Sequence, residues 1–127
     1  DRAGMDFITV ERSFDLPAAL PALDRHGTVL FDSFTACLSE QMFPGPAPDA
    51  DAANRVLREL LDISRYPAHF IAVCDDIWHG GEDYRDWTEV YVRGLADICQ
   101  GLAAEFDVVC EMTAGLPRLW KGELPRV

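Results

Sequence analysis

The chain has 127 residues, which is enough for one modest domain with its own hydrophobic core. Its formal net charge is −11 and Lys121 is its single lysine. This argues against general binding to nucleic acids or anionic membranes, since such binding depends on lysine and arginine. No apolar run approaches the length of a membrane span, and residues 1–4 carry no secretory pattern.

The cysteines bear on the cellular compartment. None of them is paired at Cys-x-x-Cys spacing, which argues against a zinc site; they are Cys37, Cys74, Cys99 and Cys110. We interpret them as mostly buried thiols of a cytoplasmic protein instead of disulfides. The first residue, Asp1, is not an initiator methionine, so we also interpret the chain as processed or trimmed.

The first two elements predicted along the chain are short. Residues 7–10 are apolar or β-branched and predict a short strand. Asp15 is a candidate cap for a helix over residues 16–23. Because Pro21 lies inside this helix, we expect it to be short or kinked.

Residues 28–32 are the most informative stretch. They are apolar or β-branched up to Phe31 and then end in Asp32, which is typical of a strand buried on both faces of a parallel sheet. Ligands of open α/β sheets bind at the carboxyl ends of strands, so Asp32 could hold Mg²⁺ through a water, as a Walker-B carboxylate does. It could equally cap the following helix, and the residue alone leaves both interpretations open.

The rest of the chain alternates between helices and strands. Apolar spacing predicts helices over residues 34–43, 51–64 and 86–105, and strands over residues 69–74, 107–112 and 118–121. This alternation predicts a single α/β domain over residues 1–127, with a mostly parallel sheet and crossover helices.

A second predicted strand also ends in carboxylates. Asp75 and Asp76 follow it, and with His79 they could form a metal cluster. Metal sites need three or four convergent ligands, so a solvated loop is the favoured interpretation. Glu11 follows the first short strand and is uninformative by itself.

The usual phosphate-binding loop does not occur in this sequence. A search for G-x-x-x-x-G-K-[ST] fails, and there is no Gly-Lys pair. Any nucleotide site formed by these 127 residues is therefore incomplete as a P-loop site.

Five short segments, taken in order, carry a resemblance to one family. Residues 9–11 resemble its T-x-E strand, and residues 30–35 its hydrophobic-D/E-C-[IL]-T segment. Residues 73–76 stand where the family has V-[ST]-N-E, residues 103–109 resemble A-A-x-A-D-E-V, and residues 114–121 resemble A/S-G-[IL]-P-x-x-[IL]-K. The family comprises the bifunctional adenosylcobinamide kinase/adenosylcobinamide-phosphate guanylyltransferases.

The resemblance implies a P-loop-NTPase-like, RecA-like core and a role in cobalamin (vitamin B12) biosynthesis. The implied reactions are phosphorylation of adenosylcobinamide and transfer of GMP to the phosphate product. The implied partners are the corrinoid substrate and GTP or ATP with Mg²⁺. The chain resembles the C-terminal two-thirds of a family member, and none of His26, His69 and His79 matches the family's guanylylated histidine.

The resemblance also implies roles for individual residues. Asp32 would lie beside the nucleotide phosphates as the catalytic and metal-binding carboxylate, and Thr35 and Glu11 would line the same end of the sheet. The loop facing the corrinoid or nucleotide would contain Asp75, Asp76 and Gly80.

Some positions depart from the family pattern. Asp75 and Asp76 replace an Asn-Glu pair, Trp78 replaces a glycine, and Cys99 replaces an asparagine of the long helix. An alternative is therefore a non-catalytic binding or assembly subunit. A third interpretation is a metal-dependent hydrolase that uses Asp32, Asp75 and Asp76.

A sheet whose central strand is missing exposes edges, so we expect a homo-oligomer or a missing N-terminal segment.

Overall fold

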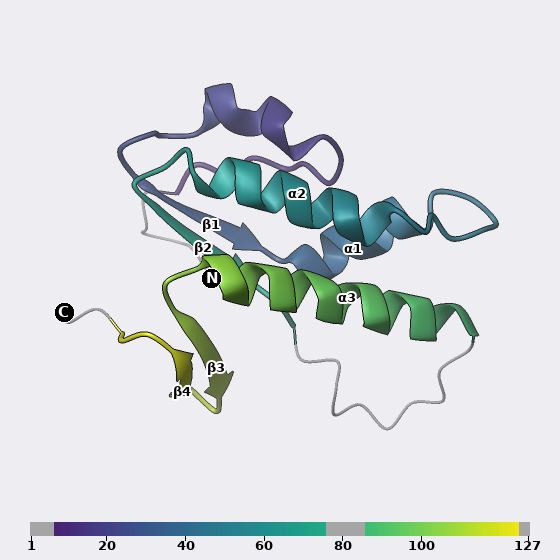
Figure 1. Cartoon of the computed structure of the whole chain (residues 1–127). Coiled ribbons are helices and arrows are strands. Elements are labelled where there is room, and N and C mark those ends of the chain that lie inside the picture. The colour runs from purple at the N-terminus through teal and green to yellow at the C-terminus, as the bar shows by residue number, and fades with distance from the viewer. Residues whose placement is uncertain (1–6, 76–85, 125–127) are drawn as a thin grey trace.

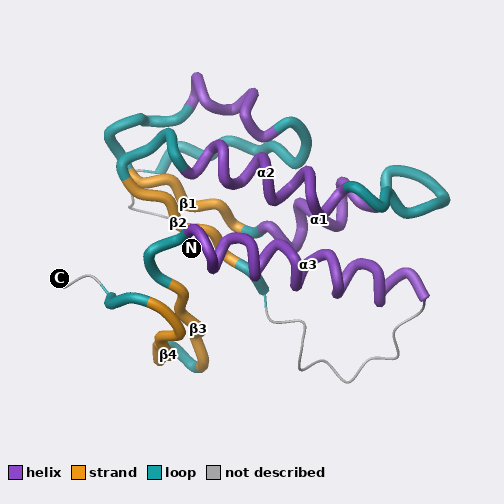
Figure 2. The backbone as a smooth tube through the Cα atoms, in the orientation of Figure 1, coloured by secondary structure: helices purple, strands orange, loops and turns teal. Residues whose placement is uncertain are grey.

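In the computed structural model, residues 7–75 and 86–124 are described (Figure 1). Their helices and strands alternate along the chain, as the tube in Figure 2 shows. The elements in chain order are the 3₁₀ helix η1 (Leu16–Ala22), β1 (Thr28–Asp32), α1 (Phe34–Met42), α2 (Ala52–Ser64), β2 (His69–Val73), α3 (Asp86–Glu105), β3 (Val109–Thr113) and β4 (Leu116–Lys121).

The first sheet contains two parallel strands. β1 and β2 pair in register from Thr28 opposite His69 to Asp32 opposite Val73. The chain passes from one strand to the other through α1 and α2, which make the crossover. The prediction of parallel strands joined by crossover helices is confirmed for this pair.

The second sheet is an antiparallel hairpin of β3 and β4, apart from the first sheet. Figure 1 shows it beyond the C-terminal end of α3. Ala114 and Gly115 form its two-residue turn, with φ of 51° and 79°. Such a turn matches the right-handed twist of a hairpin and pairs β3 with its sequence neighbour. The expectation of a mostly parallel sheet is therefore wrong for two of the four described strands.

The single lysine joins this hairpin to α3. Lys121 Nζ donates hydrogen bonds to the carbonyl oxygens of Ala103 (2.9 Å) and Ala104 (3.3 Å). These carbonyls lie in the last turn of α3, where the helix has no internal donors left and where a positive charge is favourable. The only lysine of the chain thus caps a helix C-terminus.

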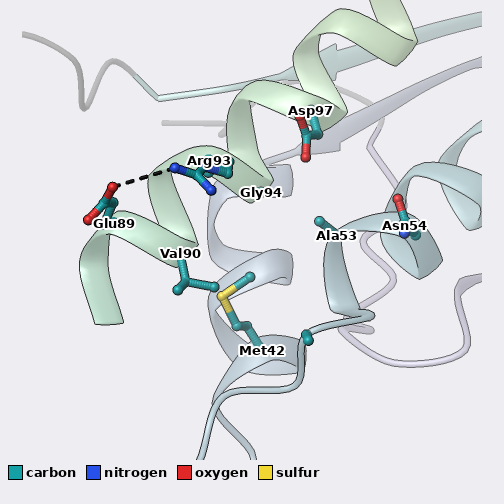
Figure 3. A pocket seen from close by; sticks show the side chains of 9 residues that line it. Met42, Ala53, Asn54, Glu89, Val90, Arg93, Gly94 and Asp97 are labelled. Carbon is teal, nitrogen blue, oxygen red and sulfur yellow. Dashed lines mark ion pairs between the residues drawn. The ribbon is translucent and has the colours of Figure 1, made fainter. Parts of the chain in front are cut away.

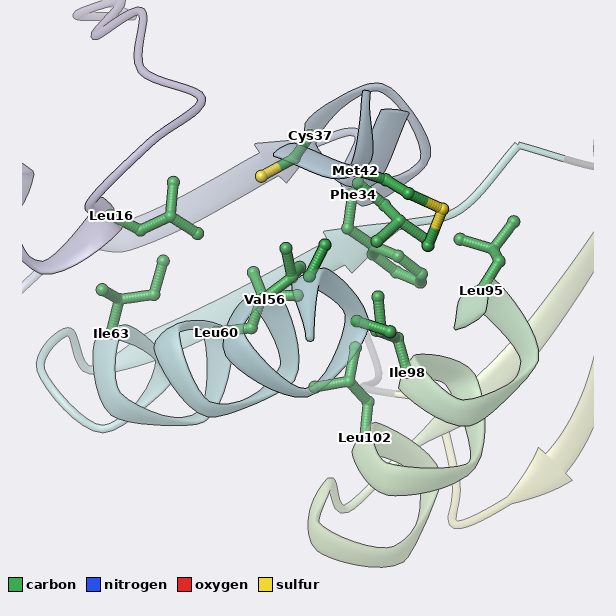
Figure 4. Close-up of a cluster of buried hydrophobic side chains, with 13 residues drawn as sticks. Leu16, Phe34, Cys37, Met42, Val56, Leu60, Ile63, Leu95, Ile98 and Leu102 are labelled. Atoms are coloured by element: carbon green, nitrogen blue, oxygen red, sulfur yellow. The ribbon is translucent and has the colours of Figure 1, made fainter. Parts of the chain in front are cut away.

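The core lies between the helices and one face of the parallel sheet (Figure 4). α1 contributes the predicted stripe of Phe34, Leu38 and Met42, and all three side chains are buried. α2 and α3 face this stripe with residues at helical spacing. Their buried apolar residues are Ala52, Ala53, Val56, Leu60, Ile63, Leu95, Ile98 and Leu102.

The other face of the parallel sheet is exposed. Phe31 and Phe70 pack against the core, whereas Leu30 is 43% exposed and Ile71 is 51% exposed on the alternate face. The expectation that residues 28–32 are buried on both faces is therefore wrong. The physical reason is that the described helices all pack against the face that carries Phe31 and Phe70, and nothing in residues 7–75 or 86–124 covers the opposite one.

The N-terminal elements differ from the sequence-based expectation. Residues 7–10 are not in a strand, since the two sheets of the described residues consist of β1 to β4. The expected short helix is the 3₁₀ helix η1, with Pro21 inside it. Asp15 does not cap it through its side chain; its carbonyl oxygen accepts a hydrogen bond from the Ala18 N–H (3.0 Å).

The described helices include no candidate for a membrane span. None of them combines the length and the hydropathy that crossing a bilayer requires.

Candidate functional site

The candidate site lies where β1 and β2 end side by side. Asp32 and Val73 are paired as the last residues of their strands. The segments that follow, residues 33–35 and 74–75, therefore meet at one edge of the sheet. This is the edge at which open parallel sheets bind ligands.

Ser33 begins α1 and also contacts the second strand end. Its Oγ accepts a hydrogen bond from the Ala36 N–H (3.4 Å), which makes Ser33 the helix N-cap. Its hydroxyl donates to Asp75 Oδ2 (3.2 Å). The cap is therefore Ser33, and the interpretation of Asp32 as the helix cap is wrong. The sequence carried this signal, since Ser33 directly precedes the apolar stripe of α1.

Thr35 ties three elements together. Its Oγ1 accepts a hydrogen bond from the Asp75 N–H (2.9 Å) and donates to Cys74 Sγ (3.7 Å). Its carbonyl oxygen accepts a hydrogen bond from the Tyr91 hydroxyl of α3 (2.8 Å). The side chain is 8% exposed, so these bonds are largely shielded from water. Thr35 thus fixes the backbone of Asp75 in place.

Tyr91 is a site residue that the sequence analysis did not single out. Its place in the apolar stripe of α3 marked it only as a core residue. Burial, with smaller contributions from negative charge at Cys74 and Asp75, raises the pKa of Tyr91 to about 12. At neutral pH Tyr91 is therefore a phenol that donates to Thr35, and no local sequence pattern reveals this contact.

Four of the expected site residues lie in described segments. Asp32 and Asp75 are exposed at the strand ends, and Thr35 lies between them and the core. Glu11 is exposed in the segment before η1, and none of the hydrogen bonds that join Ser33, Thr35 and Asp75 involves it.

The remaining expected positions lie outside the described residues. These are Asp76 and Gly80, together with His79 of the weighed metal cluster.

The oxygen donors at this edge suit a hard cation that shares its coordination with a phosphate. The carboxylates of Asp32 and Asp75 and the hydroxyl of Ser33 lie on the segments that meet there. Mg²⁺ in nucleotide sites takes one or two carboxylates together with phosphate oxygens and waters. The described residues contain no group of three or more His, Cys, Asp or Glu side chains for an all-protein cage. The donor set therefore fits a magnesium–nucleotide complex better than a metal held by protein alone.

A separate cavity of about 360 Å³ lies between α1, α2 and α3 (Figure 3). Met42 and Ala53 form part of its floor, and Glu89 and Arg93 form an ion pair at its rim (3.5 Å). The cavity contains none of the expected site residues. Substitutions that line it are therefore controls for the strand-end site.

Two comparisons with known proteins bear on the strand-end site. A family model described as CobU, cobinamide kinase / cobinamide phosphate guanyltransferase, matches residues 1–119. A search of curated proteins gave no match.

Proposed function

Since the chain belongs to the CobU family of cobinamide kinase / cobinamide phosphate guanyltransferase proteins, we propose that it binds a nucleoside triphosphate at the carboxyl ends of β1 and β2. Family membership implies a role in cobalamin biosynthesis. The proposed reactions are phosphorylation of adenosylcobinamide and GMP transfer to the product. The observation that carries the proposal is the convergence of Asp32, Ser33 and Asp75 at one edge of a parallel strand pair.

The proposed division of labour follows from exposure and hydrogen bonding. Asp32 and Asp75 are exposed and would hold Mg²⁺, which would supply positive charge against the nucleotide phosphates. Ser33 orients the Asp75 carboxylate through its hydroxyl, and Thr35 fixes the Asp75 backbone. Catalysis of phosphoryl transfer is mainly positioning and charge neutralisation. The hydrogen bonds from Ser33 and Thr35 would contribute by holding the Asp75 carboxylate in a fixed position.

A non-catalytic binding subunit is the second candidate function. It is favoured by Asp75 and Asp76, two aspartates that stand where the family pattern has Asn-Glu. Such a subunit would bind nucleotide or corrinoid without turnover.

Calorimetry with GTP and ATP, each with Mg²⁺ and with a chelator, tests the proposal. We expect binding that depends on Mg²⁺ and weakens at least about tenfold in Asp32→Asn, since a ligating carboxylate is lost. Asp97→Asn, an exposed change at the cavity in α3, is the matched control and should bind like the unmodified chain. Failure to bind either nucleotide would overturn the proposal.

Turnover separates the two candidate functions. With adenosylcobinamide and γ-labelled GTP, transfer of label to the corrinoid identifies a kinase. Nucleotide binding with no transfer of phosphate or GMP identifies a binding subunit.

A further inference from the structure

Two thiols lie against each other behind the strand-end site. Cys74 directly follows β2 and Cys99 lies in α3, yet their Sγ atoms are 3.9 Å apart. The Cys99 thiol donates a hydrogen bond to the Cys74 sulfur. Both side chains are half-buried, so each is partly accessible to a small reagent.

The two sulfurs are in van der Waals contact and are not covalently bonded. A disulfide has an S–S bond of about 2.0 Å, so the sulfurs must approach by roughly 2 Å. A side-chain rotation supplies a movement of this size. The other two thiols have different neighbours: Cys37 contacts Ser13 and Gln41, and Cys110 contacts Glu111 and Met112.

The hydrogen bonds give the two sulfurs different roles. Cys74 Sγ accepts from the Cys99 thiol and from the Thr35 hydroxyl (3.7 Å). The Cys74 thiol in turn donates to the Asp75 carbonyl oxygen (3.4 Å). We assign the first attack to Cys74, since the proton between the two sulfurs lies on Cys99. The hydrogen bond to Cys74 and burial raise the pKa of Cys99, which keeps it protonated until the second step.

We propose that Cys74 and Cys99 form a reversible disulfide by exchange with a small-molecule disulfide of the glutathione class, and that this bond weakens ligand binding at the strand ends. Cys74 thiolate attacks one sulfur of the small disulfide and releases one thiol, which takes up a proton. Cys99 then gives its proton to solvent and attacks the Cys74 sulfur, releasing the second thiol. The protein loses two hydrogens, and the small disulfide is reduced to two thiols.

The effect on the strand ends follows from the contacts of Cys74, and this part rests on the proposed function. Closing the bond draws the Cys74 sulfur toward α3 and away from the Thr35 hydroxyl. Thr35 Oγ1 holds the Asp75 N–H, so its reorientation displaces a carboxylate of the site. We expect nucleotide affinity to fall several-fold on oxidation.

The test uses the 127-residue chain in oxidised and reduced glutathione, with intact mass and non-reducing peptide mapping. The variant Cys37→Ala/Cys110→Ser keeps only the proposed pair. We expect it to lose two hydrogens as a monomer, to join the peptides that contain Cys74 and Cys99, and to recover both thiols with dithiothreitol. Cys74→Ser and Cys99→Ser should each stop at a mixed disulfide with glutathione on the remaining member of the pair.

Other outcomes would contradict the proposed Cys74–Cys99 disulfide. Retention of both thiols in the pair-keeping variant, or bonds that join separate chains, would contradict it. In the unmodified chain, a disulfide that joins Cys74 or Cys99 to Cys37 or Cys110 would also contradict it.

The binding effect is measured separately by nucleotide calorimetry on the oxidised and reduced forms. Equal affinity of the two forms would contradict the regulatory part. A reduced chain that binds no nucleotide would instead contradict the proposed function, and the mapping result would still decide whether the bond forms.

Discussion

At the residue scale, Thr35 does more than line the strand ends. Its hydroxyl accepts from the Asp75 backbone and donates to Cys74, and its carbonyl holds Tyr91. A single largely buried threonine therefore links α1, β2 and α3. The sequence suggested a ligand-facing role, whereas the contacts describe a positioning residue.

Replacement of Thr35 by valine tests this positioning role. Thr35→Val keeps the side-chain shape but leaves the Asp75 N–H without its acceptor. We expect a loss of about 1–3 kcal/mol in the free energy of unfolding, the cost of an unsatisfied donor that is shielded from water. Urea denaturation measures this loss. Thr28→Val, on the exposed face of β1, is the control, and equal effects of the two changes would contradict the role.

The raised pKa of Tyr91 predicts a loss of stability at alkaline pH. Burial raises the pKa of the phenol from its ordinary 10.0 to about 12 in the folded chain, so the folded state holds the proton more tightly. The stabilisation is fully present below pH 10 and is lost as the pH rises toward 12.

Tyr91→Phe removes the hydroxyl group, and with it both the ionisable proton and the hydrogen bond to the Thr35 carbonyl oxygen. We expect it to be less stable at pH 8 and to lose less additional stability between pH 10 and 12. Thermal unfolding across this range measures both effects. Parallel pH profiles for the two chains would contradict the assignment.

At the element scale, local patterns were sufficient for the three helices and the two parallel strands. Apolar spacing placed α1, α2 and α3 because each buries a stripe against the same core. The patterns were insufficient where tertiary pairing decides the outcome. Residues 7–10 have strand-like residues but no described partner strand, and β3 pairs with β4 because a two-residue turn joins them.

Gly94 lies where α3 packs closely against α1 and α2. A Cβ atom there would lie 3.1 Å from Ala53 Cβ of α2 and 3.1 Å from Met42 Cε of α1. Gly94→Val adds two methyl groups beyond such a Cβ atom, and we expect overpacking to lower the free energy of unfolding by about 1–3 kcal/mol. Chemical denaturation measures this loss. Gly45→Val is the control, because nothing lies within 4 Å of a Cβ there; a Gly94 variant as stable as this control would contradict the packing.

At the scale of the whole molecule, one sheet face remains open. Leu30 and Ile71 are exposed on the face of β1 and β2 that the described helices do not cover. The antiparallel hairpin adds further exposed apolar side chains in Met112, Leu116 and Trp120. Exposed apolar surface of this kind commonly marks an interaction surface.

The open sheet face supports the prediction of self-association. Sedimentation of the chain at micromolar concentration should show species larger than a monomer. Leu30→Lys/Ile71→Lys should shift the distribution toward the monomer, since charge on the open face opposes association. A stable monomer of the unmodified chain would contradict the prediction, and Val108→Lys, outside this face, is the matched control.

The candidate site was predictable only in outline. Asp32 and Asp75 could be proposed because carboxylates at the ends of neighbouring parallel strands lie at one edge. The Ser33–Asp75 hydrogen bond, Tyr91 as a donor and the Cys74–Cys99 contact depend on how α1, the end of β2 and α3 pack together. No local pattern encodes contacts between residues so far apart in the chain.

The most direct test of the strand-end site is amide chemical-shift mapping of the isotope-labelled chain titrated with GTP and Mg²⁺. The account predicts the largest shifts at the amides of Ser33, Thr35 and Asp75, with Asn54 and Asp97 of the separate cavity unchanged. Shifts confined to that cavity, or no shifts at saturating nucleotide, would contradict it.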